Sequence, residues 1–163
     1  MSDINRSYRE TLQNLDLLYD YINVMFFGGE LLPALITLEV EETNRRGYYQ
    51  FKSPYGRYVP IERINLNPLH FNSEEGWETP ARTLLHECIH QYARSVGIVD
   101  YESGKHTADF KRVAEQHGMK VIDVPDPDKG YYFATLNDSS KRLLLEFCKD
   151  FAPPFAVGAS RIS

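Results

Sequence analysis

Apolar side chains recur every three or four residues along the first part of the chain. Within residues 7–26 the repeating positions are Leu12, Leu15, Leu18, Tyr19, Ile22 and Phe26. This spacing places them on one face of an α-helix. Gly28 and Gly29 follow directly, and glycine is typical of the position just beyond a helix end. We therefore expect a helix over residues 7–26 that covers a sheet.

The pattern then changes to an alternation of period two. In residues 35–40 one face would carry Ile36, Leu38 and Val40. Such alternation predicts a β-strand with one buried face. Residues 47–51 and 59–66 are the next strand candidates, and a Pro-Tyr-Gly turn signal separates them. Together these segments predict a small sheet.

A second helical pattern has both of its ends specified. Thr79 suits the N-cap, Pro80 suits the first helical position, and Gly97 lies just past the end. Its apolar stripe consists of Ala81, Leu84, Leu85, Cys88, Ile89, Tyr92, Ala93 and Val96. If this stripe packs into a core, the opposite side of the helix faces a cleft.

Three further elements complete the expected fold. Residues 107–118 predict a helix with Phe110, Val113 and Ala114 in the core, and residues 120–124 predict a short strand. A last helix over residues 139–151 would end before Pro153 and Pro154. Its core positions would be Leu144, Leu145, Cys148 and Phe151. We expect one α+β domain over residues 1–152, in which a small sheet packs on the second helix, followed by a flexible C-terminal tail over residues 153–163.

The polar side of the second helix carries His86, Glu87 and His90. A helix places two histidines four residues apart on one face, where both can bind a single metal ion, and the glutamate between them can act as general base on a metal-bound water. The alternative is an ordinary solvated face of an amphipathic helix. A third ligand would favour the metal site.

His106 is our candidate for the third ligand. It follows a glycine-containing turn that could fold the chain back towards the second helix. A carboxylate ligand remains an alternative through Glu102 or Glu115. A histidine six residues after the motif is excluded, because that position is Val96.

These segments resemble the SprT-like zinc metalloprotease family, which includes proteases of DNA–protein crosslinks. The resemblance rests on His86-Glu87-x-x-His90, on residues 104–110 and 117–119, and on the upstream segments 21–33, 46–49 and 64–68. It implies a zincin-like fold, zinc held by His86, His90 and His106, and Glu87 as the base. The zinc ribbon of many relatives needs four thiolates, whereas this chain has only Cys88 and Cys148.

Composition sets the broad class. The chain has 163 residues, of which 42% are hydrophobic and 25% charged, as expected for one globular domain. Residues 1–15 contain no apolar run of a secretory signal, and no stretch approaches the roughly 20 apolar residues of a membrane span. Two cysteines at core positions fit a reducing compartment. We expect a cytoplasmic protein without a membrane partner.

Charge is unevenly distributed along the chain. The formal net charge is −5, yet residues 44–61 contain no acid. The cations there are Arg45, Arg46, Lys52 and Arg57, and the aromatic residues between them include Tyr48 and Tyr49. Cations beside aromatic rings suit single-stranded DNA. The alternative is an aromatic-rich strand pair whose cations are simply solvated.

Two neighbouring tyrosines are candidates for a further role. Tyr131 or Tyr132 could donate a hydrogen bond to the oxyanion that forms during hydrolysis, although paired aromatic residues also commonly serve packing.

The sequence therefore predicts a zinc endopeptidase that cleaves a protein or peptide, with DNA-bound or DNA-crosslinked proteins as one substrate class implied by the resemblance. The alternative is a non-catalytic, zinc-stabilised adaptor that binds DNA or protein. Glu87 favours the enzyme, because a structural site has no need for a carboxylate at that position. A zinc hydrolase acting on a non-peptide bond is a third class.

Overall fold

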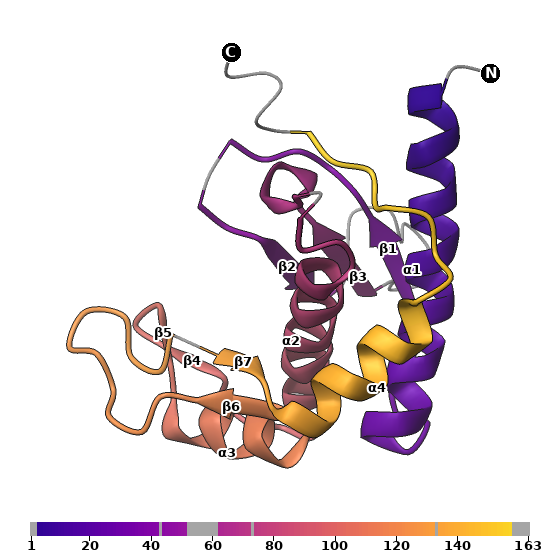
Figure 1. The fold of residues 1–163 in the computed structure, drawn as a ribbon. Helices are drawn as coiled ribbons and strands as arrows, with labels where there is room; N and C mark the ends of the chain where they lie inside the picture. Colours follow the sequence, from indigo (N-terminus) through magenta and orange to yellow (C-terminus); the bar gives the residue numbers. More distant parts are fainter. Residues whose placement is uncertain (1–2, 43, 52–61, 73, 133, 158–163) are drawn as a thin grey trace, which may run out of the picture.

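The computed structural model describes residues 3–42, 44–51, 62–72, 74–132 and 134–157 (Figure 1). Within them it contains α-helices and short strands, which confirms the α+β class. The helices are α1 (Asp3–Phe27), α2 (Glu78–Ser95), α3 (Ala108–Gln116) and α4 (Asp138–Cys148), with a 3₁₀ turn η1 (Pro68–His70). The strands are β1 (Ala34–Thr37), β2 (Gly47–Gln50), β3 (Glu62–Leu66), β4 (Tyr101–Glu102), β5 (Lys105–His106), β6 (Met119–Val121) and β7 (Ala134–Leu136).

Helix α2 lies in the middle of the molecule, with α1 and α4 on one side and the β4–β5 and β6–β7 pairs on the other (Figure 1). The apolar stripe expected from the sequence is buried, and Leu84, Leu85, Cys88 and Ile89 are inaccessible to solvent. Val96 is an exception, because it lies at the C-cap and is half exposed. Burial of this stripe fixes the rotation of α2 about its axis.

The three-stranded sheet has the order β1-β3-β2. Strand β1 is parallel to β3 and pairs Ile36 with Ile64, whereas β2 is antiparallel to β3 and pairs Tyr49 with Ile64. Every residue of β3 is buried, as expected for a central strand. Strand β2 is at the edge of the sheet and packs beside α2.

Helix α1 is longer than the expected 7–26, because Asp3 supplies an acidic residue in the first turn and no proline or glycine interrupts the segment. Helix α2 begins at Glu78, with Trp77 as N-cap, so the prediction of Thr79 as N-cap was wrong. Thr79 Oγ1 donates a hydrogen bond to the Glu75 carboxylate instead. Helix α4 ends at Cys148 rather than at Phe151. Beyond the helix end, the Phe151 amide donates a hydrogen bond to the Cys148 carbonyl and forms a turn.

The strand expected over residues 35–40 ends at Thr37, because two buried asparagine side chains replace further strand pairing. Asn65 Oδ1 accepts from the Glu39 amide at 2.7 Å, and Asn65 Nδ2 donates to the Glu39 carbonyl at 3.1 Å. Asn67 Nδ2 donates to the carbonyls of Glu41 and Arg45. The segment leading to β2 is therefore held against β3 by side chains.

Strand β7 was not expected from the sequence, because its three residues are too few to show a period. The strand expected over residues 120–124 corresponds to β6, which ends at Val121. The strand expected over residues 59–66 begins at Glu62 among the described residues, and Phe51, expected at the end of the preceding strand, lies beyond β2.

Both cysteines are buried and free. No helix in the described ranges is long and apolar enough to cross a membrane.

Part of the segment expected as a tail contacts the body of the protein. The Phe155 amide donates to Thr11 Oγ1 at 2.8 Å, and the Phe155 ring meets Tyr8 edge-on at 5.4 Å. The Val157 amide donates to the Pro68 carbonyl at 3.2 Å. Residues 158–163 of the expected tail lie outside the described part.

Candidate metal centre

Two elements bring three histidines together. Helix α2 carries His86 and His90 one turn apart, and β5 carries His106 opposite Tyr101 of β4. Ser103 and Gly104 connect these strands with φ values of 53° and 76°, as in the two-residue turns that favour hairpins. The hairpin turns the chain back so that His106 faces α2.

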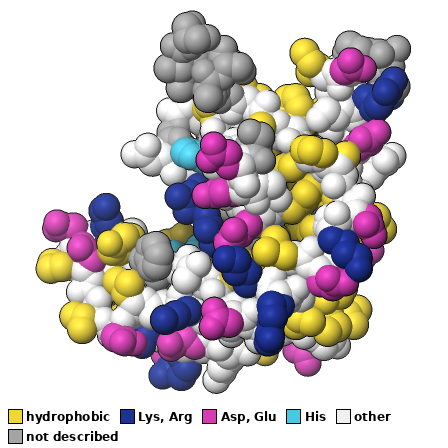
Figure 2. Space-filling model, in the orientation of Figure 1, with side chains coloured by type: hydrophobic (Ala, Val, Ile, Leu, Met, Phe, Trp, Pro, Cys, Tyr) yellow, Lys and Arg dark blue, Asp and Glu magenta, His cyan; other side chains and the backbone are white. Residues whose placement is uncertain are grey.

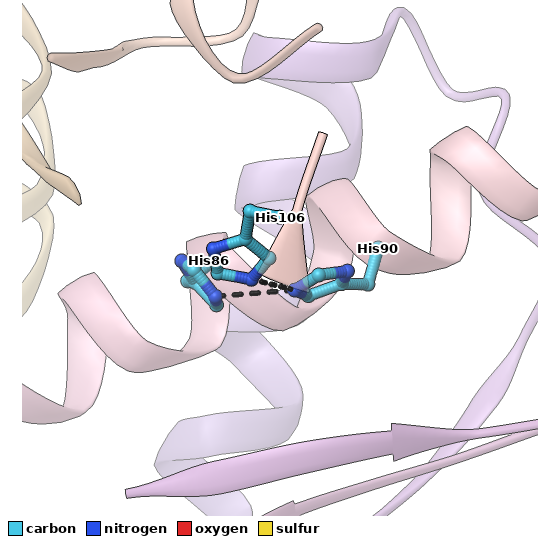
Figure 3. Close-up of side chains that lie close together, drawn as sticks. All are labelled: His86, His90 and His106. Atoms are coloured by element: carbon cyan, nitrogen blue, oxygen red, sulfur yellow. Dashed lines mark hydrogen bonds between the residues drawn. The ribbon is translucent and has the colours of Figure 1, made fainter. Parts of the chain in front are cut away.

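The imidazoles converge through their Nε2 atoms (Figure 3). His90 Nε2 lies 3.2 Å from His86 Nε2 and 3.2 Å from His106 Nε2. One ligand nitrogen from each of the three rings lies within 4.8 Å of the others. Glu102 and Glu115, the alternative third ligands, do not belong to this cluster. Glu102 is exposed on β4, and Glu115 pairs with Lys111.

The outer ring nitrogens determine which tautomers are present. His90 Nδ1 lies 2.8 Å from the Asp100 carboxylate, and His106 Nδ1 lies 2.9 Å from the Tyr131 carbonyl. Both partners only accept hydrogen bonds, so each Nδ1 carries a proton, and in the neutral rings each Nε2 presents a lone pair. Two lone pairs face each other across 3.2 Å. That contact is favourable only with a cation between them.

The donor set fits a zinc ion. Tetrahedral zinc with Zn–N bonds of about 2.0–2.1 Å separates its nitrogen ligands by roughly 3.3–3.4 Å, close to the two observed separations. Three histidines also leave one position for water, as in catalytic rather than structural zinc sites. The rings of His86 and His106 are neutral, because burial and the neighbouring imidazoles lower the pKa of His86 and lower that of His106 to about 4.

Glu87 lines the same cleft as His86 and His106. Its side chain is buried, and burial raises its pKa to about 7, although His90 and Arg45 oppose the shift. A carboxylate with this pKa can take up and release a proton near neutral pH.

The cleft beside the histidines has a volume of about 520 Å³. The segment before β2, helix α2, the β4–β5 hairpin and the start of β7 form its walls. Figure 2 shows Lys and Arg side chains beside a hollow in which histidine atoms are visible. His86 and His106 therefore border a cavity that is open to solvent.

Asp100 is a site residue that the sequence analysis missed. Its Oδ2 atom contacts His90 Nδ1, and Arg94 Nε lies 3.5 Å from the same oxygen. Burial alone would raise the pKa of Asp100, but the hydrogen bond from His90 and the charge of Arg94 lower it below its usual value. The carboxylate therefore stays charged and orients the ring.

Tyr101 is a second missed residue. Its hydroxyl lies 3.4 Å from His90 Nε2, and its ring stacks on His90 at 4.9 Å and on His106 at 4.8 Å. Burial raises the pKa of Tyr101, so the hydroxyl keeps its proton and can donate it in a hydrogen bond. The two-residue Ser-Gly turn was the signal that could have placed Tyr101 opposite His106.

The two tyrosines expected near the oxyanion have different surroundings. Tyr131 contributes its carbonyl to His106, and its ring lies near Lys111. Tyr132 lines the cleft with a half-exposed side chain. Of these two side chains, only that of Tyr132 lines the cleft.

The basic and aromatic segment makes internal contacts. Arg45 forms two hydrogen bonds with Glu41 and lies 4.6 Å from the centre of the Tyr48 ring. The Tyr49 hydroxyl donates to Glu62 at 2.5 Å. Arg46 lines the cleft, whereas Lys52 and Arg57 lie outside the described residues. These contacts favour the packing alternative for Tyr48 and Tyr49, and DNA binding stays a prediction.

Comparison with known proteins identifies the family of the chain. The model of the SprT-like family matches residues 15–129, more than two thirds of the chain and all three histidines of the cluster. Searches of the curated proteins and of the solved structures found no match. The matched range includes every segment on which the resemblance seen in the sequence rests. Because this match covers more than half of the chain, the chain belongs to the SprT-like family.

Proposed function

We propose that this protein is a zinc-dependent endopeptidase. His86, His90 and His106 would hold the metal, and Glu87 would act as general base. The observation that supports this most strongly is the pair of facing Nε2 lone pairs of His90 and His106, in a cleft that also contains a carboxylate able to exchange a proton near neutral pH.

The roles of the protein groups follow from their positions. When bound, zinc supplies a Lewis acid for the scissile carbonyl and lowers the pKa of water. Glu87 accepts the proton of the attacking water and delivers it to the leaving nitrogen. Asp100 orients His90 through Nδ1. The Tyr101 hydroxyl lies beside Nε2 of His90, where it can hydrogen-bond the carbonyl oxygen as negative charge develops there.

Strand β2 supports binding of an extended peptide. It is an edge strand, and Gly47 at its start lines the cleft together with Glu87. An added peptide strand would bind chiefly through main-chain hydrogen bonds, which leaves side-chain specificity to the cleft walls.

Metal analysis and cleavage of an unfolded protein test this function together. We expect about one zinc per chain, cleavage that stops with a chelator and returns with zinc, and loss of zinc in His106→Ala. Glu102→Ala and Glu115→Ala are matched controls that should keep the metal. Retention of full zinc by His106→Ala would show that the third ligand is wrong.

The same experiment separates the enzyme from an adaptor. Zinc binding without cleavage of any unfolded, DNA-bound or DNA-crosslinked protein would favour the adaptor. DNA-bound proteins as substrates are proposed from the family resemblance. Single-stranded DNA as a partner is proposed from the basic and aromatic segment, of which Arg46 lines the cleft. A cytoplasmic location is likewise part of the proposal.

A further inference from the structure

The cleft wall is more basic than the chain as a whole. The net charge is −5, yet the wall includes Arg45, Arg46 and Arg82. Among the described residues that line the cleft, Glu87 is the one carboxylate. The cleft is therefore a locally positive environment, and negative groups are attracted into it.

Two of these arginines have no ion-pair partner among the described residues. Arg45 is paired with Glu41 at 2.7 Å. The guanidinium groups of Arg46 and Arg82 form no ion pair with any described residue. The residues outside the described ranges contain no Asp or Glu, so no carboxylate side chain there can pair with them.

Both arginines come from well-anchored backbone. Arg82 lies on α2 four residues before His86, so it is one turn away on the same face, with Cβ atoms about 5–6 Å apart. The Arg46 carbonyl accepts from the Asn67 amide at 2.7 Å, and the Arg45 carbonyl accepts from Asn67 Nδ2 at 3.0 Å. The backbone at both positions is therefore held in place, and both side chains line the cleft.

We propose that Arg46 and Arg82 form a subsite for a carboxylate side chain of the peptide substrate. The proposal rests on the proposed peptidase function and adds a substrate class to it. A guanidinium group binds a carboxylate through two parallel hydrogen bonds. Because an extended peptide advances about 3.3–3.6 Å per residue, a subsite one helical turn from His86 selects Asp or Glu within about two residues of the cleaved bond.

The position of the subsite favours a peptide over a nucleic acid. Arg46 and Arg82 line the same cleft as Glu87 and His106, so the group they bind belongs to the molecule being cut. A single-stranded nucleic acid needs a longer basic track with free aromatic platforms. In the neighbouring segment Arg45 pairs with Glu41 and lies on Tyr48, and the Tyr49 hydroxyl is bound to Glu62.

Paired peptides that differ only in Glu or Gln beside the cleaved bond test the subsite. We expect the zinc-loaded parent to prefer the Glu peptide in kcat/KM by roughly 10- to 100-fold, as for hydrogen bonds to charged groups. The double variant Arg46→Gln/Arg82→Gln should bring this ratio close to one. The matched control Arg112→Gln/Arg142→Gln loses the same charge outside the cleft and should keep the preference.

Binding gives a second measurement that does not need catalysis. Fluorescence anisotropy of the same labelled peptides with zinc-loaded Glu87→Gln should show tighter binding of the Glu peptide, and adding Arg46→Gln/Arg82→Gln should remove the difference. Circular dichroism and zinc content establish that each variant is folded and loaded.

The outcomes distinguish the subsite from the peptidase. Cleavage without a Glu preference in the parent, or a preference that survives in Arg46→Gln/Arg82→Gln, would overturn the subsite and leave the peptidase intact. Selective binding of the Glu peptide without any cleavage would support the subsite and contradict the peptidase. If the double variant loses affinity for a single-stranded oligonucleotide but keeps its peptide preference, the cations serve phosphate and the carboxylate subsite is wrong.

Discussion

The Asp100 carboxylate lies 2.8 Å from Nδ1 of His90, on the side of the ring opposite the nitrogen that faces His86 and His106. One hydrogen bond therefore fixes both the orientation of the ring and the nitrogen that can bind a metal. Asp100 follows α2 in the chain and precedes the hairpin that carries His106, so it links the two elements of the centre.

The first prediction concerns this contact. Asp100→Ala should lower zinc affinity by about 10- to 100-fold, because His90 loses the acceptor that holds its tautomer and orientation. Asp100→Asn, which keeps an acceptor oxygen without the charge, should lose less. Competition with a chromophoric chelator measures the affinity. Asp20→Ala, an exposed change on α1, serves as control, and equal affinities for Asp100→Ala and this control would contradict the proposed role.

The second prediction concerns proton transfer. Glu87→Gln should keep zinc and fold, because the side chain retains its size and is not a ligand, and it should slow peptide cleavage by about 10²- to 10⁴-fold. Zinc content and cleavage are measured on the same sample. Cleavage at the parent rate would rule out Glu87 as the base.

The periodicity of the sequence predicted the parts of the site that lie on α2. An apolar stripe determines which face of a helix is buried, so the positions of His86 and Glu87 follow from it. Asp100 and Tyr101 lie in a short segment without a period, and their contacts depend on the β4–β5 register that pairs Tyr101 with His106. That register follows from the turn at Ser103 and Gly104, a weak local signal.

The third prediction concerns Tyr101. Tyr101→Phe keeps the ring that stacks on His90 and His106 and removes only the hydroxyl, so zinc content should be unchanged. We expect kcat to fall by about 10²-fold with little change in KM, as for the loss of one oxyanion donor. Steady-state kinetics measure the split between kcat and KM.

Tyr132→Phe is the matched control, since Tyr132 lines the cleft with a half-exposed side chain. If Tyr132→Phe lowers kcat and Tyr101→Phe does not, the oxyanion donor is Tyr132, one of the two tyrosines expected from the sequence.

Other features arise only from packing between elements. Gly47 needs to be glycine because a Cβ there would lie 2.6 Å from the Asn65 carbonyl oxygen and 2.9 Å from Thr83 Cγ2. No local pattern reveals this close approach of β2 to α2. The sequence likewise could not show that Asn65 and Asn67 would serve as buried hydrogen-bonding partners for a separate segment of backbone.

The last prediction concerns Asn67, which is fully buried and connects β3 to the segment before β2. Its Nδ2 donates to the carbonyls of Glu41 and Arg45, and its Oδ1 accepts from the amides of Glu41 and Leu69. Asn67→Ala leaves these backbone groups without partners, so the free energy of unfolding should fall by about 2–4 kcal/mol. Urea unfolding measures it.

The control is Asn72→Ala, which removes one exposed hydrogen bond to the Glu75 amide and should lower the free energy of unfolding by roughly 0.5–1 kcal/mol.

Because the histidines lie on α2 and β5, Asn67→Ala should keep zinc while the Arg45–Arg46 segment loses its anchor. The Glu-over-Gln preference in cleavage should then fall together with stability. A variant as stable as the parent would show that water replaces these hydrogen bonds and that Asn67 does not hold the cleft wall in place.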